Sequence, residues 1–247
     1  MPAIVLDHVT KQFGETIAVK DLSLSIERGA FVGLLGRNGA GKSTTLKMLT
    51  GLLALTSGRI TLLDQDFGAH ALTLKRRIGV MPEDMALLEM LTGPQYLRFV
   101  GRMYGLDDAT VDARRAELFE KLDLSPGART AIADYSFGMK KKVALCAALV
   151  HAPEVLFLDE PFEGIDPVTS RTIKDILAAL RKRGTTILLT SHILEIVEKL
   201  CEEIAILEKG ELRGFGTLED LRKGASLEAA FVELVGGARV GELSWLT

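Results

Sequence analysis

The sequence predicts an α/β fold with a helical subdomain inserted into it. Short apolar runs typical of buried strands recur along the chain, at 31–35, 155–158 and 186–190. An amphipathic helical pattern lies between two of these runs, over 169–183. Between about residues 84 and 152, helical patterns occur without a convincing strand, which indicates the inserted helical subdomain.

Composition is that of an ordinary globular protein. The 247 residues are 47% hydrophobic and 26% charged, with a net charge of −3 that gives no reason to expect a nucleic-acid partner. No apolar stretch approaches the length of a membrane span, and the N-terminus lacks the pattern of a secretory signal. Cys146 and Cys201 form neither a disulfide framework nor a metal-binding spacing. We therefore expect a cytoplasmic protein.

A glycine-rich segment, GRNGAGKST, lies between a predicted strand and a predicted helix and fits the phosphate-binding pattern G-x-x-x-x-G-K-[ST]. Its glycines permit a turn that aims successive N–H groups at an anion, and the helix that starts near Gly41 adds the positive end of its dipole. Lys42 can reach the β- and γ-phosphates, and the Ser43 hydroxyl can bind Mg²⁺. The candidate phosphate-binding residues are Gly36, Asn38, Gly39, Ala40, Gly41, Lys42, Ser43 and Thr44.

Two adjacent acids, Asp159 and Glu160, follow the apolar run at 155–158. Ligands of α/β sheets bind at the carboxyl ends of the strands, and an acidic residue there holds Mg²⁺ in phosphate-loop proteins. Glu160 can orient and activate an attacking water. The simpler interpretation is a pair of acids on a solvated turn, but the preceding phosphate loop favours the catalytic one.

Three further candidates are weaker when taken alone. His192 follows the run at 186–190 and can bind a phosphate oxygen, although a lone histidine is more often structural. Phe13 lies in an expected turn at 11–14, where it is either an ordinary half-buried ring or a platform for a nucleobase. Ser136 and Gly138 open a helix whose exposed N-terminus suits an anion, or is simply a capped helix with a basic first turn.

The remaining predicted elements are short, and the chain is expected to form one domain over 1–224, with the helical subdomain at about 84–152 and a tail at 225–247. Strands are expected at 4–9, 22–26, 59–63, 78–81, 203–207 and 211–215, and helices around 44–52, 96–104, 111–122 and 217–222. In the tail, Leu227, Phe231, Leu234 and Val235 form a helical stripe consistent with a helix that packs against the domain.

In combination, these motifs resemble the ATP-binding cassette (ABC) ATPase, the nucleotide-binding subunit of ABC transporters, over residues 4–222. The matches are Gly36–Thr44 to Walker A, Val155–Glu160 to Walker B with Glu160 at the catalytic glutamate, Tyr135–Met139 to the signature motif, Glu163–Asp166 to the D-loop, His192 to the switch histidine, Phe13 to the aromatic ring that stacks on adenine, and Glu83 to the Q-loop glutamine. The resemblance implies a P-loop NTPase core with a mixed sheet, an N-terminal antiparallel β subdomain and the helical insertion.

The chain departs from the family pattern at two places. The signature usually reads LSGGQ and here reads YSFGM, which keeps Ser136 and Gly138. Glu83 replaces a glutamine, so that a carboxylate that only accepts hydrogen bonds lies near the expected Mg²⁺. Both changes resemble the exporter-type cassettes that pair with ABC-2-type permeases.

The resemblance also implies an activity and partners. ATP with Mg²⁺ would be bound and hydrolysed, with Ser43, Asp159 and Glu83 near the metal and with Glu160, His192 and Lys42 catalytic. Two cassettes, here expected to be two copies of this chain, would enclose two ATP molecules head to tail and drive a separate membrane permease. The protein would then lie at the inner face of the cell membrane.

Two other functions also use a phosphate-binding loop. Soluble ABC-type ATPases that act on nucleic acid or ribosomes usually carry two cassettes or long inserts, whereas this chain has one cassette and no cysteine cluster. A GTP-binding switch would be expected to carry an N-K-x-D motif, which the sequence lacks. The energising subunit of an exporter is therefore the favoured prediction.

Overall fold

A computed structural model describes residues 1–124, 129–222, 224 and 226–236. The strands are β1 (Pro2–Phe13), β2 (Thr16–Glu27), β3 (Phe31–Gly36), β4 (Ser57–Leu62), β5 (Gln65–Asp66), β6 (Ile78–Met81), β7 (Val155–Asp159), β8 (Thr186–Ser191), β9 (Glu203–Glu208) and β10 (Glu211–Thr217). The helices are α1 (Lys42–Leu49), α2 (Phe67–Lys75), α3 (Gly93–Met103), α4 (Asp108–Lys121), the 3₁₀ helix η2 (Ile132–Asp134), α5 (Phe137–Leu149), α6 (Pro167–Lys182), α7 (Leu194–Leu200), α8 (Leu218–Arg222) and α9 (Leu227–Val235). Within the described residues, no helix combines the length and apolar character that crossing a bilayer requires.

A six-stranded sheet forms the centre of the molecule, in the order β10-β9-β3-β8-β7-β6. Its strands are parallel except for β10, which pairs antiparallel with β9. The predicted mixed sheet and the hairpin through Lys209-Gly210 are therefore confirmed. Because the strands β3, β7 and β8 are parallel neighbours, the segments that follow them meet at one edge of the sheet.

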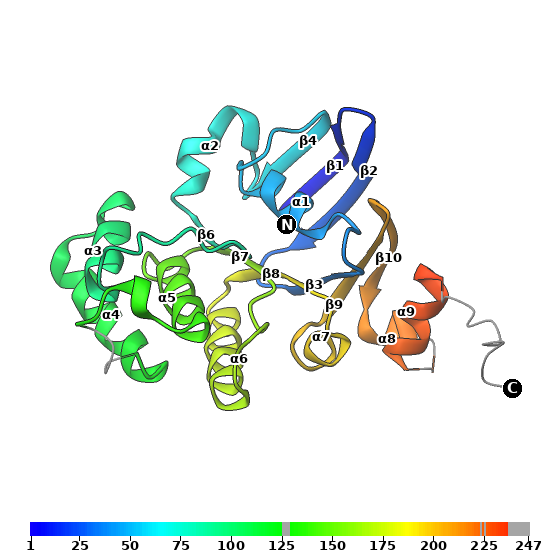
Figure 1. Cartoon of the computed structure of the whole chain (residues 1–247). Helices are drawn as coiled ribbons and strands as arrows, with labels where there is room; N and C mark the ends of the chain where they lie inside the picture. Colours follow the sequence, from blue (N-terminus) through cyan, green and yellow to red (C-terminus); the bar gives the residue numbers. More distant parts are fainter. Residues whose placement is uncertain (125–128, 223, 225, 237–247) are drawn as a thin grey trace, which may run out of the picture.

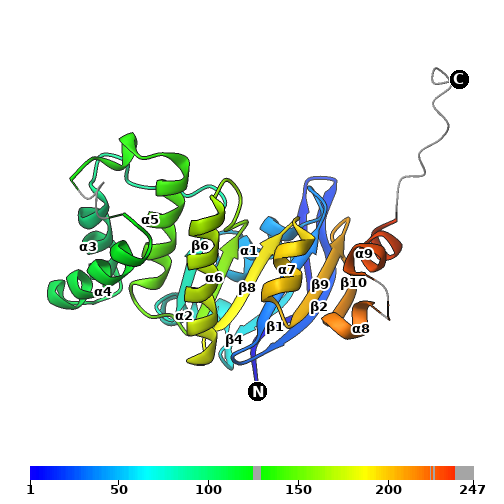
Figure 2. The same cartoon turned by 90° about the horizontal axis from the view of Figure 1, so that it is seen from below.

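Both faces of the central sheet are covered, which explains the continuous apolar runs. In β7, Val155 and Phe157 pack into the core beneath the N-terminal sheet, whereas Leu156 and Leu158 pack into the core on the opposite face. Helix α1 lies between the two sheets, and α5, α6, α7 and α9 cover the other face (Figures 1 and 2). A strand that is buried on both faces needs apolar residues at every position.

The second sheet is antiparallel, in the order β2-β1-β4-β5, and it confirms the predicted N-terminal β subdomain. The expected turn at 11–14 is wrong in part, because residues 11–13 continue β1 and pair with β2. The turn is instead the Gly14-Glu15 pair, where Gly14 has φ +55°. The apolar pattern ends before the strand does, since backbone pairing continues past the buried core in this exposed hairpin.

The helical part of the chain forms one end of the molecule, where α3 and α4 lie far from the central sheet (Figure 1). No strand occurs between β6 and β7 in the described residues, although an isolated bridge joins Thr92 and Ala131. Helix α5 lies closer in, with Val143 and Leu145 buried in the same core as strand β7. The short helices α2 and α7 were not predicted from the sequence. In α2, a non-helical backbone at His70 interrupts the period that such predictions use.

The beginning of the predicted tail is a helix that packs on the domain. Ser226 caps α9 by accepting a hydrogen bond from the Ala229 N–H at 3.1 Å. Leu227 is fully buried, and Phe231, Leu234 and Val235 pack against the same core. The tail thus begins with a helix at Leu227–Val235 that packs on the domain, and residues 237–247 of the predicted tail lie outside the described residues.

Candidate functional site

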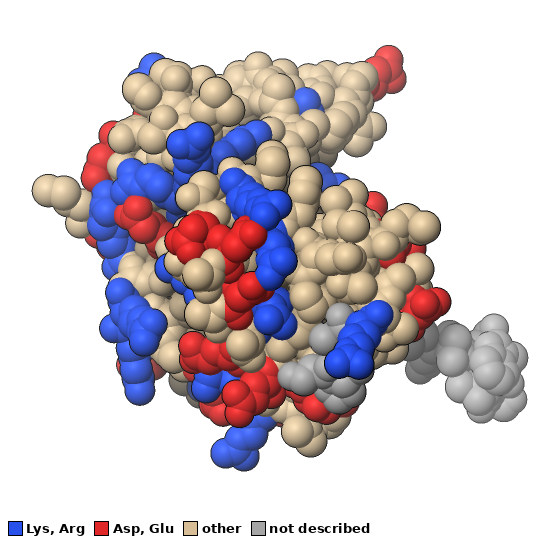
Figure 3. All heavy atoms as spheres, turned by 90° about the vertical axis from the view of Figure 1, so that its left-hand side faces the viewer, with Lys and Arg blue, Asp and Glu red and all other residues tan. Residues whose placement is uncertain are grey.

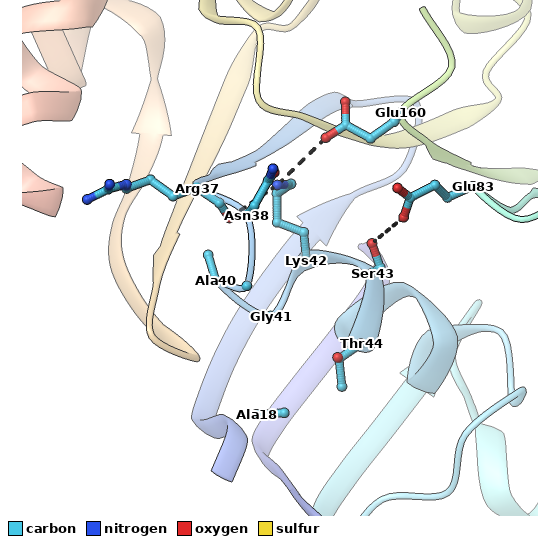
Figure 4. Close-up of a pocket in the computed structure, with 11 residues that line it drawn as sticks. Ala18, Arg37, Asn38, Ala40, Gly41, Lys42, Ser43, Thr44, Glu83 and Glu160 are labelled. Carbon is cyan, nitrogen blue, oxygen red and sulfur yellow. Dashed lines mark hydrogen bonds and ion pairs between the residues drawn. The ribbon is translucent and has the colours of Figure 1, made fainter. Parts of the chain in front are cut away.

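A cavity of about 380 Å³ opens where β3 runs into α1 (Figure 4). Its lining is formed mainly by the glycine-rich loop and the first turn of α1, together with three residues from elsewhere in the chain. The lining residues are Ala18, Arg37, Asn38, Gly39, Ala40, Gly41, Lys42, Ser43, Thr44, Glu83 and Glu160. Of the predicted phosphate-binding residues, all except Gly36 line this cavity.

The backbone of the loop requires glycine at the start of α1. Gly41 has φ +103°, and a Cβ there would lie 2.7 Å from the carbonyl oxygen of Ala18. Both the backbone conformation and the close approach of β2 therefore exclude a side chain. As a result, α1 begins without a side-chain cap, and no acidic residue lies in its first turn. Its first N–H groups remain available to an anion.

Lys42 carries a positive charge into the cavity. Its side chain is 6% exposed, and Nζ donates a hydrogen bond to the carbonyl oxygen of Gly36 at 2.8 Å. The same Nζ lies 3.6 Å from Glu160 Oε1. Gly36 thus belongs to the site through its carbonyl, which holds the ammonium group over the loop. A buried ammonium group with few partners attracts the phosphate oxygens of a nucleotide strongly.

Three oxygen-bearing side chains converge beside the loop. Ser43 Oγ lies 3.2 Å from Asp159 Oδ1 and 3.4 Å from Glu83 Oε2. One hydroxyl and one or two carboxylates are the protein ligands that Mg²⁺ uses when nucleotide phosphates and waters complete its octahedron. The donor set therefore fits Mg²⁺. Within the described residues there is no group of three or more His, Cys, Asp or Glu that could hold a metal without such help.

Glu160 is held at the edge of the cavity by a strained and well-bonded backbone. Its φ is +47°, and its N–H donates to Thr190 Oγ1 at 3.0 Å. The Thr190 hydroxyl in turn donates to Asp159 Oδ1 at 2.5 Å. His192 approaches from β8, with Nδ1 at 3.1 Å from Glu160 Oε1. The structure thus brings the two predicted acids and the predicted histidine together.

Ser136 and Gly138 do not line this cavity in the described structure. Ser136 caps α5, as predicted, by accepting a hydrogen bond from the Met139 N–H at 3.2 Å. Its side chain is exposed, and the nearest atom to a Cβ added at Gly138 is the carbonyl oxygen of Gly164, at 3.8 Å. The N-terminus of α5 is therefore open to a ligand from outside the chain.

Phe13 also lies apart from the lining of the cavity. Its ring is 49% exposed near the end of β1, and Lys11 Nζ lies 4.9 Å from the ring centroid. A large exposed ring on a hairpin is available for stacking on a base.

Four residues of the site were missed in the sequence. Arg37 occupies a variable position of the motif, and Ala18 belongs to β2, so neither carries a signal in the pattern. Thr190 binds both acids from the neighbouring strand, and strand order cannot be read from the chain. Lys141 belongs to a basic stretch near the start of a helix that was expected to be exposed, but it lies in the second turn of α5 and is buried completely. The one feature of the sequence that could have indicated its role is a lysine on the face of α5 that packs against the core.

Comparison with known proteins agrees with this geometry. The family model described as ABC transporter matches residues 19–163. The linearmycin resistance ATP-binding protein LnrL of Bacillus subtilis is 40% identical over 215 residues, which cover 87% of this chain and 69% of the relative. The Nod factor export ATP-binding protein I of Bradyrhizobium diazoefficiens is 40% identical over 84% of this chain and 68% of its own length.

The fold also matches solved structures. One described as the ATP binding subunit of an ABC transporter superposes with a TM-score of 0.89 at 32% identity, covering 94% of this chain and 99% of the other. The phosphate loop, the acids after β7 and the histidine after β8 occur in this chain on that same fold. The chain therefore belongs to the ABC transporter family, as one of its ATP-binding cassette subunits.

Proposed function

We propose that this ATP-binding and ATP-hydrolysing cassette supplies the energy for export through a separate membrane permease. The observation that carries the proposal is the convergence of Lys42, Ser43 and Glu160 on one cavity, with Asp159 bonded to Ser43 beside it. Relatives are named for linearmycin resistance and for Nod factor export, which supports an exporter. The chain would then work in the cytoplasm, at the inner face of the membrane that holds the permease.

The proposed reaction is attack of water on the γ-phosphate. Asp159, Ser43 and Glu83 would hold Mg²⁺, which supplies neutralising charge for the phosphates when it is bound. Lys42 would bind the β- and γ-phosphates, and Glu160 would orient the water and accept its proton. His192, 3.1 Å from Glu160, would donate a hydrogen bond to the γ-phosphate and keep the carboxylate in place.

We infer that the complete site needs a second copy of the chain. Ser136 and Gly138 lie at an exposed helix N-terminus that takes no part in the cavity of its own chain. A head-to-tail pair would place them against the γ-phosphate that is bound by Lys42 of the other copy, with two ATP molecules enclosed. Phe13 would stack on the adenine ring from the β subdomain.

The helical part of the chain, 84–152 in our proposed division of the domain, offers a surface for the permease. Several large apolar side chains are exposed in and around it, on α2, on α3 and in the connecting segments. They are Leu52, Leu72, Met90, Phe99 and Met103. Leu52 and Tyr104 line a common cavity of about 170 Å³, together with residues at the end of α1, in α2 and in β6. Exposed apolar side chains on a single protein are typical of an interaction surface.

The proposed roles are tested by comparing Lys42→Ala and Glu160→Gln with wild type. We expect Lys42→Ala to lose nucleotide binding. Glu160→Gln should still bind Mg-ATP but hydrolyse it at least about 100-fold more slowly, because only the general base is lost. Equilibrium binding of a fluorescent ATP analogue and phosphate release measure the two effects.

Glu120→Gln is the matched control, since it makes the same chemical change on the exposed face of α4 and should leave turnover unchanged. Wild-type turnover in a folded Glu160→Gln variant would contradict the role given to Glu160. Recovery of a polytopic membrane protein with the tagged chain from solubilised membranes would support the permease, and recovery of ribosomes would contradict it.

A further inference from the structure

Lys141 is a buried charge with no place in the mechanism described so far. It lies in the second turn of α5 and is 1% exposed. Among the described residues, Lys42 and Lys141 are the two buried lysines, and Lys141 is the more deeply buried. Burial lowers its pKa, against the opposing effect of nearby carboxylates. Removing an ammonium group from water is costly unless partners compensate for the loss of hydration.

The best partner of this ammonium group belongs to the hydrolytic site. Lys141 Nζ donates to the backbone carbonyl oxygen of Glu160 at 2.7 Å. Its ion-pair partner Glu163 Oε2 lies at 3.8 Å, beyond hydrogen-bond distance, on a side chain that is half exposed. The short hydrogen bond to Glu160 is therefore the interaction that determines where the side chain lies.

The backbone of Glu160 is held by hydrogen bonds at both its carbonyl and its N–H group. The Glu160 N–H is fixed by Thr190 on strand β8. Between them, Glu160 has φ +47°, a left-handed conformation that is unfavourable for a residue with a side chain. Such a conformation persists only where its surroundings enforce it, and here the groups bonded to the Glu160 backbone are Thr190, Lys141 and the Glu163 N–H.

The same end of α5 also packs on the segment after Glu160. A Cβ added to Gly164 would lie 2.7 Å from the ring of Phe137, and Lys141 Nζ lies 5.1 Å from that ring. Ser136 and Gly138 thus lie at the start of α5, about one turn before Lys141, which supports the backbone of Glu160. A shift of this helix end would be transmitted directly to the carboxylate.

We propose that Lys141 is a positioning residue that fixes the backbone of Glu160 and so couples the Ser136 end of α5 to hydrolysis in the same chain. The inference rests on the proposed function, in which Ser136 contacts the nucleotide of the second copy. In that arrangement, when Ser136 contacts the ATP of the second copy, α5 would reposition Glu160, the general base for the ATP held by its own chain. Lys141 itself touches neither nucleotide nor water in this mechanism.

Lys141→Met is the principal test because it keeps the length of the side chain and removes its donor. The variant should fold, since the carbonyl of Glu160 keeps its hydrogen bond from the Glu163 N–H at 3.3 Å, and the Glu163 carboxylate that loses its partner is half exposed to water. We expect kcat to fall about tenfold or more, with KM and the Kd of Mg-ATP changed by less than about twofold.

Three comparisons make the result specific. Lys141→Gln keeps an N–H donor without the charge and should retain several times the kcat of Lys141→Met. Adding Lys141→Met to Glu160→Gln should cause no further loss, because the group that it positions is already disabled. Lys140→Met, one residue earlier and paired with Glu89, should behave as wild type.

Several results would overturn the inference. One is an unchanged kcat in Lys141→Met. Another is an equal loss of kcat in Lys141→Met and Lys141→Gln. A third is a lower melting temperature together with a loss of nucleotide affinity that accounts for the lower activity. Failure of the proposed function is distinguishable, because in that case wild type would not hydrolyse ATP or Glu160→Gln would be fully active.

Discussion

Two buried lysines, Lys42 and Lys141, show how position decides what one residue type does. Lys42 lies at an open cavity, and its ammonium group is held by the carbonyl of Gly36 at 2.8 Å. Lys141 is enclosed, and its ammonium group reaches the carbonyl of Glu160 at 2.7 Å. Glu160 is the shared neighbour, approached through its carboxylate by one lysine and through its backbone by the other. The first can bind a phosphate, whereas the second can only support the protein.

His151 is a residue whose burial makes stability depend on pH. Its ring stacks on Tyr104 with centroids 3.6 Å apart, and Nε2 lies 2.9 Å from the carbonyl oxygen of Ile78, to which it donates in the neutral form. Burial lowers the pKa of His151 to about 4 from 6.5. Because the folded protein disfavours the charged ring, the stabilisation is complete above pH 6.5 and is lost as the pH falls toward 4.

We expect this one residue to lower the free energy of unfolding by about 2 kcal/mol between pH 8 and pH 5. His151→Phe keeps a ring for the stack and removes the titrating group, so that its loss of stability over this range should be smaller by about that amount. Urea denaturation of both proteins at the two pH values measures the difference. An identical pH dependence in the two proteins would show that His151 is not buried as a neutral ring.

Side-chain caps mark the starts of several helices. Ser136, Asp166 and Ser226 each accept a hydrogen bond from the N–H three residues later, at the starts of α5, α6 and α9. Helix α1 is different, because it begins at Gly41 without a cap, and its start was predicted from the phosphate-binding motif. An uncapped helix start is the local irregularity that a phosphate site needs.

Helix α9, which follows β10 and α8, packs on the central core. Leu227 is fully buried on this helix, whereas Val232 on the same helix is 48% exposed. We expect Leu227→Ala to reduce the free energy of unfolding by about 2–4 kcal/mol, as for other buried leucines. Val232→Ala should cost less than about 0.5 kcal/mol. Chemical denaturation of the two variants, compared with wild type, checks both values, and equal effects would contradict the packing described here.

At the scale of the whole molecule, the two halves of the proposed site lie on different surfaces. The cavity lies where β3 meets α1, and Ser136 lies at the exposed start of α5. Charged side chains of both signs are interspersed over the α3–α4 end of the molecule (Figure 3). That face therefore presents no single-sign surface of the kind that nucleic acid would require.

A crosslinking experiment tests the head-to-tail pair. We expect Asn38→Cys and Ser136→Cys, combined with Glu160→Gln, to form covalent dimers with a short bismaleimide when Mg-ATP is present. The native Cys146 and Cys201 are buried, and burial raises the pKa of both thiols, so that they should react slowly. The control combines Asn38→Cys and Glu160→Gln with Glu120→Cys in place of Ser136→Cys, and it should give no dimer. Dimers that form equally without nucleotide would contradict the arrangement.

The sequence by itself determined the elements of the site and their chemistry. A phosphate loop, acids after an apolar strand and a histidine after another are local patterns, because each depends on residues close together in the chain. Strands buried on both faces leave continuous apolar runs, so that the α/β class was also predictable. The mixed sheet was implied by the resemblance to ABC ATPases. The turn at 11–14 and the helices α2 and α7 were not, since pairing and packing outweighed weak local patterns there.

Only the tertiary structure decided which of these patterns meet. Strand order brought Thr190 beside both acids, and the packing of α5 turned Lys141 inward to the carbonyl of Glu160. Neither contact follows from local pattern, because each joins residues about 20 to 30 positions apart whose proximity depends on the assembled core. The physical reason is that burial and register are properties of the packed sheet, whereas propensity and motif are properties of the chain.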